Sequence, residues 1–363
     1  MPMSMPIRAA VTRSSDGETA IEDLILDGPG PGEVLVRIQA SGICHTDFLA
    51  PQIMPLPTVL GHEGTGEVIE VGEGVTGFRP GDRVVGSYGC CGRCDNCTSG
   101  ETFHCRDFQT IQLGSRRSDS PALHRSDGTP VSGAFFEQSS FATHALMTER
   151  NCVRVETTLP PEYLAPLGCG VLTGFGAVDA VLQPRPGQSL LVIGAGGVGL
   201  SAIMAARILG CDPIIAIDVL PARLEQARAF GATRVLDGGQ PDLLGSVHAC
   251  CPDGVDFSLE TVSGEATFNL GLQATRAGGR FGVVALPNMG AAFEISSGRP
   301  LLRVDIVGII EGRSRPQDLI PRLVGLIERD ELPMADYVSV FEFDDIEDCL
   351  LYTSDAADDA MNV

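Results

Sequence analysis

The stretch of sequence that decides the fold is Ser189-Leu190-Leu191-Val192-Ile193-Gly194-Ala195-Gly196-Gly197-Val198-Gly199. Its apolar first half, which ends at Ile193, predicts a buried strand of a parallel sheet. The glycines that follow predict a tight turn. After them, apolar positions recur on one face of a helix that we expect to end near Leu209. A strand, a tight turn and a helix in this order begin a β/α unit.

The sequence downstream repeats this alternation. Pro213–Ile217 predicts a second strand, and Leu220–Phe230 predicts a helix that Pro221 starts and Gly231 stops. Further strands are expected near Val235, over Asp256–Leu259 and over Arg280–Leu286. Alternating strands and helices predict an α/β fold with a parallel, doubly wound sheet.

The glycine-rich turn has the spacing of a dinucleotide site. Gly194 permits the tight turn, Gly196 lets the backbone approach a pyrophosphate, and Gly199 allows close packing of helix and strand. Asp218 follows Gly199 by nineteen positions, where its carboxylate would accept hydrogen bonds from ribose hydroxyls. Asp218 would also repel a 2′-phosphate, so we expect NAD rather than NADP, although Arg223 is close enough in sequence to complicate that preference. The alternative, a glycine-rich turn without a ligand, is disfavoured by Asp218.

The first 100 residues have a different pattern. Val34, Val36 and Ile38 alternate with their neighbours at the period of a strand, and a Gly-Pro-Gly turn precedes them. Glu67–Val71 predicts a second strand. Residues 79–85 predict a turn and a third strand. The high density of glycine in this region favours a small barrel with tight corners.

Three residues that are far apart in the sequence form a candidate metal site. Cys44 and Cys169 offer thiolates, and His62 offers an imidazole. Two thiolates and a neutral imidazole leave the fourth position of a Zn²⁺ ion open, which is the ligand count of a catalytic rather than a structural zinc site. None of the three residues would attract notice alone, so the prediction depends on their occurring together.

A second group of cysteines has the spacing of a structural zinc site. Its members are Cys91, Cys94, Cys97 and Cys105. Four thiolates at such short spacing can enclose one Zn²⁺ and hold a loop that has little core of its own. Disulfides are the alternative, which we consider less suited to a chain without an evident export signal. Cys90 is an extra neighbour, and the spacing favours Cys91.

Composition limits the classes of function. A chain of 363 residues predicts two domains. The net charge of −22 disfavours nucleic acids and anionic membranes as partners. The longest apolar run, Ser189–Leu209, is interrupted by glycines and fits a strand, turn and helix better than a membrane span. The 12 cysteines point to metal binding or free thiols in a reducing compartment, so we expect a cytoplasmic protein.

The sequence around His62 resembles the zinc-containing medium-chain alcohol dehydrogenases. The resemblance is carried by Gly61-His62-Glu63, Gly66, Gly72 and Val75. It extends from about Ile7 to Asp348, and residues 132–143 resemble the aryl-alcohol (benzyl-alcohol) dehydrogenase branch. Phe135, Phe136 and Tyr88 either line an aromatic pocket or are ordinary core residues, and the sequence does not separate these two roles.

The resemblance implies a division into two domains. A GroES-like β-barrel catalytic domain would occupy residues 1–170, with a structural zinc lobe at about 90–106. A Rossmann NAD-binding domain would follow over 171–307, and residues 308–348 would return to the catalytic domain.

The end of the chain carries three further expectations. In the returning segment, Asp318–Glu328 is expected to be helical and Tyr337–Phe343 to be a strand. Residues 349–363 do not resemble the family and are interpreted as a non-native tail, a hypothesis that resequencing of the source locus would test.

The resemblance also implies roles around the catalytic zinc. Thr46 corresponds to the hydroxyl that relays a proton, Asp47 to the carboxylate that holds the metal-ligating imidazole, and Glu63 to an acid behind the zinc that can approach the metal. The family often continues the relay with a histidine at the position of Leu49, so this chain departs from the pattern there. His45 would contact the coenzyme pyrophosphate.

The same resemblance places residues around the nicotinamide. Thr173 would pack against one face of the nicotinamide ring, and Val198 would pack against the opposite face. The full set of expected coenzyme-binding residues is His45, Thr173, Gly194, Gly196, Gly197, Val198, Gly199, Asp218 and Arg223.

The implied activity is reversible, zinc- and NAD-dependent oxidation of a primary alcohol, aryl or allylic, to an aldehyde. Two zinc ions per subunit, a small-molecule alcohol or aldehyde as substrate, and a homodimer or homotetramer follow from the resemblance. One alternative is another enzyme of the superfamily, such as an S-(hydroxymethyl)glutathione or polyol dehydrogenase. A non-catalytic dinucleotide- or zinc-binding protein is the other.

Overall fold

The computed structural model describes residues 4–114, 119–285, 292–295 and 302–350. Internal contacts divide the chain into two compact units. Among the described residues, the first unit contains those up to Cys169 and residues 315–350, and the second runs from Gly170 to Ser314.

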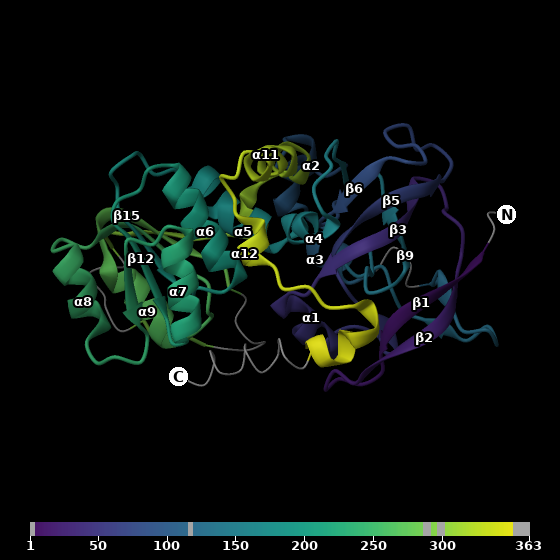
Figure 1. The fold of residues 1–363 in the computed structure, drawn as a ribbon, viewed down its shortest axis with the longest axis horizontal. Coiled ribbons are helices and arrows are strands. Elements are labelled where there is room, and N and C mark those ends of the chain that lie inside the picture. Colours follow the sequence, from purple (N-terminus) through teal and green to yellow (C-terminus); the bar gives the residue numbers. More distant parts are fainter. Residues whose placement is uncertain (1–3, 115–118, 286–291, 296–301, 351–363) are drawn as a thin grey trace. The chain divides into compact units, whose positions relative to one another are not determined.

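A six-stranded parallel sheet forms the second unit (Figure 1), in the order β13-β12-β11-β14-β15-β16. The strands are β11 (Leu190–Ile193), β12 (Ile214–Asp218), β13 (Arg234–Asp237), β14 (Val255–Glu260), β15 (Thr275–Val283) and β16 (Asp305–Gly308). The order reverses between β11 and β14, which is the switch point where doubly wound sheets bind ligands. The predicted Rossmann fold is therefore confirmed.

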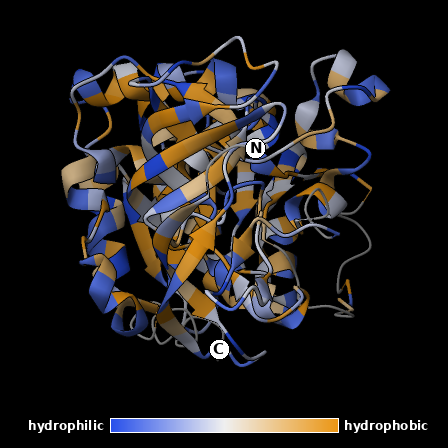
Figure 2. Ribbon diagram, turned by 90° about the vertical axis from the view of Figure 1, so that its right-hand side faces the viewer, coloured by the Kyte–Doolittle hydropathy of each residue, from blue (hydrophilic) through white to orange (hydrophobic). Residues whose placement is uncertain are grey.

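Helices alternate with these strands as the sequence predicts. They are α5 (Gly170–Gly176), a π-helix (Ala177–Leu182), α6 (Gly197–Ile208), α7 (Pro221–Phe230), α8 (Leu243–Cys250) and α9 (Glu265–Ala274). The core between helices and sheet is built from fully buried strand residues such as Leu191 and Ile215. Figure 2 shows hydrophobic residues concentrated along the strands, with hydrophilic residues interspersed on helices and loops.

The first unit consists mainly of two antiparallel five-stranded sheets, β4-β1-β2-β7-β8 and β10-β6-β5-β3-β9. Their strands are β1 (Met5–Thr12), β2 (Thr19–Leu26), β3 (Glu33–Gly42), β4 (Thr58–Val59), β5 (Glu63–Val71), β6 (Arg83–Gly86), β7 (Leu123–His124), β8 (Pro130–Val131), β9 (His144–Thr148) and β10 (Cys152–Arg154). The predicted strand is confirmed as β3, and Val34 and Val36 are fully buried against Val68 and Val84. Leu35 between them is buried too, so the side chains alternate in exposure only from Arg37 onward. This architecture agrees with the GroES-like domain that the resemblance implies.

Six α-helices, of which only α11 is longer than five residues, are described for the first unit. They are α1 (His45–Leu49), α2 (Asp95–Thr98), α3 (Phe108–Gln112), α4 (Pro161–Leu164), α11 (Pro316–Glu328) and α12 (Met334–Tyr337). The expected helix Asp318–Glu328 lies within α11. Among the described residues, no single helix is long and apolar enough to cross a membrane, although the bent pair Pro161–Gly168 and Gly170–Leu182 passes on length and composition.

Two expectations about the returning segment are wrong. The chain leaves the second unit later than residue 308, because Gly308 still pairs with Val283 at the end of β16. Tyr337–Phe343 is not a strand: Tyr337 ends α12, and no strand in the described part of the chain pairs with residues 338–342. Alternation alone does not make a strand, because the backbone also needs a hydrogen-bonded partner. The proposed non-native tail falls mostly on residues 351–363, outside the described residues.

Candidate active site

The first unit brings the three predicted metal ligands together. Cys44 lies between β3 and α1, His62 directly precedes β5, and Cys169 follows the 3₁₀ helix Ala165–Gly168. One ligand atom from each, together with a carboxylate oxygen of Glu63, forms a group whose atoms all lie within 4.8 Å of one another. Two sulfurs, one ring nitrogen and a nearby carboxylate at this spacing are suited to a Zn²⁺ ion.

The Asp47 carboxylate holds the residues of this cluster through hydrogen bonds. It is buried and accepts hydrogen bonds from the backbone N–H of Cys44 at 3.0 Å and of Gly61 at 3.1 Å. It also lies 3.1 Å from Nδ1 of His62. Because a carboxylate only accepts, Nδ1 must carry the proton, and the lone pair of Nε2 is left for a metal.

The His62 ring tests whether the cluster suits a metal. The ring is fully buried, and its Nε2 has no hydrogen-bond partner within the described part of the chain. A buried polar atom without a partner is costly, and a metal ion would remove that cost. The donor set therefore fits a zinc ion.

The cluster also favours a positive charge. The Cys169 thiol lowers the pKa of Cys44 well below its usual value, against the effect of burial, and the His62 imidazole lowers it further. Burial alone would lower the pKa of His62, but the charges of Asp47 and Cys44 raise it well above its usual value. A bound cation stabilises the same negative groups, and its binding would release protons.

Glu63 occupies space that only glycine provides. Gly42 and Glu63 are paired opposite each other in β3 and β5. A Cβ atom added to Gly42 would overlap the Glu63 carboxylate, so a side chain there would push the acid out of the cluster. The sequence analysis missed Gly42, since the fit between it and Glu63 depends on the register of two strands.

The residues expected to take part in a proton relay lie on α1. The Thr46 hydroxyl is 3.7 Å from the sulfur of Cys44. His45 is exposed and its ring centroid is 6.3 Å from that of Phe48. Leu49, where the resemblance would place a histidine, is half-buried at the end of the helix.

Tyr337 is a neighbour of the cluster that the sequence analysis also missed. Burial raises the pKa of its phenol, and the negative charges of Glu63 and Cys44 add to that effect. The residue comes from the returning segment, almost 300 positions after Cys44, so no local pattern could have indicated the proximity.

The four-cysteine cluster assembles as the spacing predicts. The sulfurs of Cys91, Cys94, Cys97 and Cys105 all lie within 4.8 Å of one another, and Cys90 does not belong to the set. The backbone N–H of Arg106 is the main cause that lowers the pKa of Cys94 to about 6, while burial raises that of Cys97. Four sulfurs in this arrangement fit a structural zinc ion.

The second unit contains the glycine-rich turn. Gly194 has a φ of 94°, which explains why glycine is needed there. A Cβ on Gly196 would meet no atom within 4 Å, so the space above this position is open to a ligand, whereas a Cβ on Gly199 would collide with the carbonyl oxygen of Gly194. Thr173 is buried on α5, and Val198 is half-buried near the start of α6.

Asp218 ends β12 beside this turn. Its carboxylate accepts hydrogen bonds from the N–H of Ala195 at 2.7 Å and of Leu220 at 3.0 Å. Arg223 forms an ion pair with it at 3.8 Å. Two hydrogen bonds use about half of the acceptor sites of a carboxylate. The carboxylate is buried beside the turn, with only 3% of its side chain exposed.

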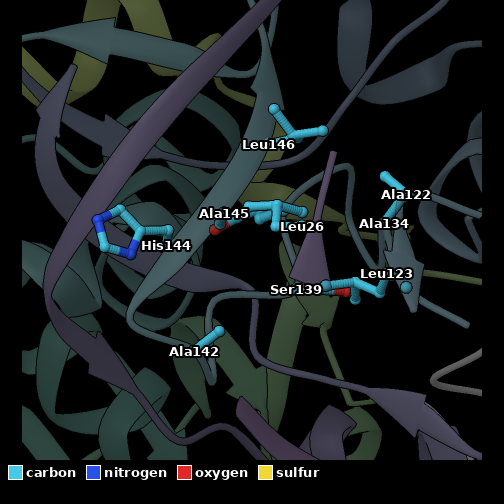
Figure 3. A pocket seen from close by; sticks show the side chains of 11 residues that line it. Leu26, Ala122, Leu123, Ala134, Ser139, Ala142, His144, Ala145 and Leu146 are labelled. Atoms are coloured by element: carbon cyan, nitrogen blue, oxygen red, sulfur yellow. The ribbon is translucent and has the colours of Figure 1, made fainter. Parts of the chain in front are cut away.

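Tyr88, Phe135 and Phe136, whose role the sequence left open, are buried in the first unit. Tyr88 is buried and its hydroxyl is 2.8 Å from that of Thr102. Phe135 and Phe136 are buried against the ring of His62. A cavity lined by residues such as Leu26, Leu123 and His144 (Figure 3) has a volume of about 30 Å³, which is room for about one water molecule and not for an aryl alcohol.

Comparison with known proteins identifies the family. Residues 30–157 match the family model "Alcohol dehydrogenase GroES-like domain", and residues 197–329 match "Zinc-binding dehydrogenase". The chain therefore belongs to the zinc-binding, medium-chain alcohol dehydrogenase family, in which NAD is the typical coenzyme.

Individual relatives lie within this family. The chain is 39% identical to geraniol dehydrogenase of Castellaniella defragrans, over 94% of this chain and 93% of that one. It is 31% identical to S-(hydroxymethyl)glutathione dehydrogenase of Escherichia coli, over 95% of both chains. The crystal structure of benzyl alcohol dehydrogenase from Acinetobacter calcoaceticus is 36% identical and superposes with a TM-score of 0.90, covering 97% of both chains.

Proposed function

We propose that this protein oxidises a primary alcohol, aryl or allylic, to the aldehyde, reversibly and with NAD. The proposal rests on one observation. The sulfurs of Cys44 and Cys169 lie close to the ring of His62, whose buried Nε2 has no hydrogen-bond partner among the described residues. Family membership makes alcohol oxidation the reaction class.

In this reaction each residue of the site would have its own role. A bound Zn²⁺ would supply a Lewis acid that makes the alcohol hydroxyl more acidic, and NAD would supply the hydride acceptor. Cys44, His62 and Cys169 would hold the metal, and Asp47 would fix the tautomer of the imidazole. Glu63 would approach the metal during ligand exchange.

Proton release would begin at Thr46. Its hydroxyl can both donate and accept, so it can pass on the proton that the alcohol loses. Because Leu49 cannot continue a relay, water or His45 would take the next step. His45 would alternatively contact the coenzyme pyrophosphate.

The second unit would bind the coenzyme. The N-terminus of α6 offers free N–H groups and positive potential to the phosphates, and Gly196 leaves them room. Asp218 would bind the adenosine ribose. The set proposed for the coenzyme is His45, Thr173, Gly194, Gly196, Gly197, Val198, Gly199, Asp218 and Arg223.

A substrate screen with metal analysis tests the proposal. We expect two zinc ions per chain and NADH formation with benzyl alcohol and geraniol, two alcohols that the names of relatives suggest. Activity mainly with S-(hydroxymethyl)glutathione would favour the rival dehydrogenase. Zinc and NAD binding without turnover of any alcohol tested would favour a non-catalytic protein.

We further propose that the chain forms a homodimer or homotetramer through the second unit. Strand β16 ends the sheet, and Ile306 in it and Ile310 just beyond are 39% and 37% exposed. An apolar edge strand is a template for pairing with a second copy.

A cytoplasmic location of the protein also stays a prediction.

Ile306→Asp is expected to shift the protein toward monomers, because a charge at this edge would be buried without a partner on association. Light scattering after size-exclusion chromatography measures the mass. Ile53→Asp is the matched control, since Ile53 is a similarly exposed isoleucine (46%) of the first unit. An unchanged mass for Ile306→Asp would rule out this edge as the interface.

A further inference from the structure

A strained segment lies next to the His62 ring. Between residues 134 and 139, four non-glycine residues have left-handed backbone angles: Ala134 (φ 58°), Phe136 (φ 50°), Glu137 (φ 55°) and Ser139 (φ 57°). Non-glycine residues rarely adopt this conformation, and clusters of them persist only where the surrounding structure enforces it. Such strain persists where a segment holds particular side chains in place.

Buried hydrogen bonds hold the segment in place. The Gln138 amide donates to the backbone carbonyls of His62 at 2.7 Å and Ser87 at 3.0 Å, and its oxygen accepts from the N–H of Gly64 at 3.1 Å. The Ser139 hydroxyl donates to the carbonyl of Val59 at 2.7 Å. The segment is thus attached on both sides of His62.

A second set of contacts fixes the middle of the segment. The buried Asn151 amide donates to the carbonyls of Phe136 at 3.2 Å and Glu137 at 3.3 Å. The Thr148 hydroxyl donates to the Glu137 carboxylate at 2.9 Å. The Asn151 bonds satisfy backbone carbonyls that the irregular conformation removes from any sheet, and the Thr148 bond holds the Glu137 side chain.

The segment delivers two aromatic rings to the imidazole. Phe136 stacks on His62 with ring centroids 4.5 Å apart and planes 30° apart. Phe135 meets the same imidazole edge-on, at 5.4 Å and 86°. With Asp47 on Nδ1, the imidazole is restrained both in its plane and across its face.

We propose that Phe136 is a positioning residue for the metal ligand His62, stacked on the imidazole so that Nε2 stays directed at the sulfurs of Cys44 and Cys169. The inference rests on the proposed zinc site. Because a ligand held in position loses less freedom on binding, Phe136 slows the loss of this metal.

The experiment follows zinc release to a chelator from protein loaded with two zinc ions. We expect Phe136→Leu, which keeps an apolar side chain but removes the ring, to release the proposed catalytic zinc about tenfold faster. Release from the four-cysteine cluster of the same molecule should not change. Phe136→Tyr retains the ring and should restore slow release.

Two further variants separate positioning from packing. Phe135 is more deeply buried than Phe136 (1% against 9% exposed), so a purely structural effect would make Phe135→Leu the more damaging change. Positioning predicts the reverse order for zinc release, because the stacked ring is lost only in Phe136→Leu. Phe281→Leu, at a fully buried phenylalanine of the second unit, should release both metals at the wild-type rate.

The results distinguish this inference from the function on which it rests. If the wild-type protein takes up zinc only in the four-cysteine cluster, the proposed function fails. If it takes up two zinc ions and Phe136→Leu releases both at the wild-type rate, or Phe135→Leu has the larger effect, the inference fails while the function stands.

Discussion

Cys44→Ala or His62→Ala is expected to reduce alcohol oxidation by about three orders of magnitude or more, with NAD binding changed little. A Lewis acid at a reacting oxygen is worth several kcal/mol, and each 1.36 kcal/mol is about a tenfold change in rate. Either variant removes one of three ligands, so the zinc content should fall from two ions to one. The glycine-rich turn belongs to the second unit and should bind NAD as before.

Cys152→Ala is the matched control for Cys44→Ala. Cys152 is a buried thiol of the same unit that packs on Met147, outside both cysteine clusters. Its loss should lower stability by about 1 kcal/mol, as small core truncations do, and leave turnover and zinc content unchanged. Zinc content of two with near-normal turnover in Cys44→Ala would remove this residue from the site.

The second unit could be predicted well from β11 to β13 and less well beyond, since β15 begins at Thr275 rather than Arg280 and β16 was not predicted. A buried strand, a glycine turn and a helix follow one another within about twenty residues, so local patterns contain the information. β11, α6 and α7 begin and end within one or two residues of the predicted positions. Asp218 lies beside the turn because parallel strands place their carboxyl ends along one edge of the sheet.

The first unit could be predicted only in part. The ligands Cys44, His62 and Cys169 were found through residue type and family resemblance, since their meeting depends on three separate connections. Of the residues that support them, Asp47 was expected. The Phe136 stack, Gln138 and Gly42 were missed, because they act through contacts between distant segments. Tyr337–Phe343 shows the opposite error, in which a strand-like pattern has no partner strand among the described residues to make it a strand.

Asp218→Ala is expected to lower the preference for NAD over NADP by about two orders of magnitude. A hydrogen bond to a charged group contributes about 1.5–3 kcal/mol, so NAD should bind roughly 10- to 100-fold more weakly without the carboxylate. NADP should gain, because the repulsion of its 2′-phosphate is removed. The ratio of kcat/KM for the two coenzymes measures the change.

Two variants test whether charge or shape is responsible. Asp218→Asn keeps an oxygen for the N–H of Ala195, so it should preserve the turn while losing the repulsion. Asp237→Ala removes the carboxylate that lies opposite Asp218 in β13, and it should leave the preference unchanged. A preference that survives in both Asp218 variants would mean that another residue selects the coenzyme.

Arg223 decides how far the preference moves. In the wild-type protein its guanidinium pairs with Asp218 at 3.8 Å, so the carboxylate neutralises the nearest cation that could bind a 2′-phosphate. Asp218→Ala removes that neutralisation, and a guanidinium binds phosphate well. The double variant Asp218→Ala/Arg223→Ala should therefore bind NADP more weakly than Asp218→Ala alone. Equal NADP affinity in the two variants would show that the gain comes from lost repulsion and not from Arg223.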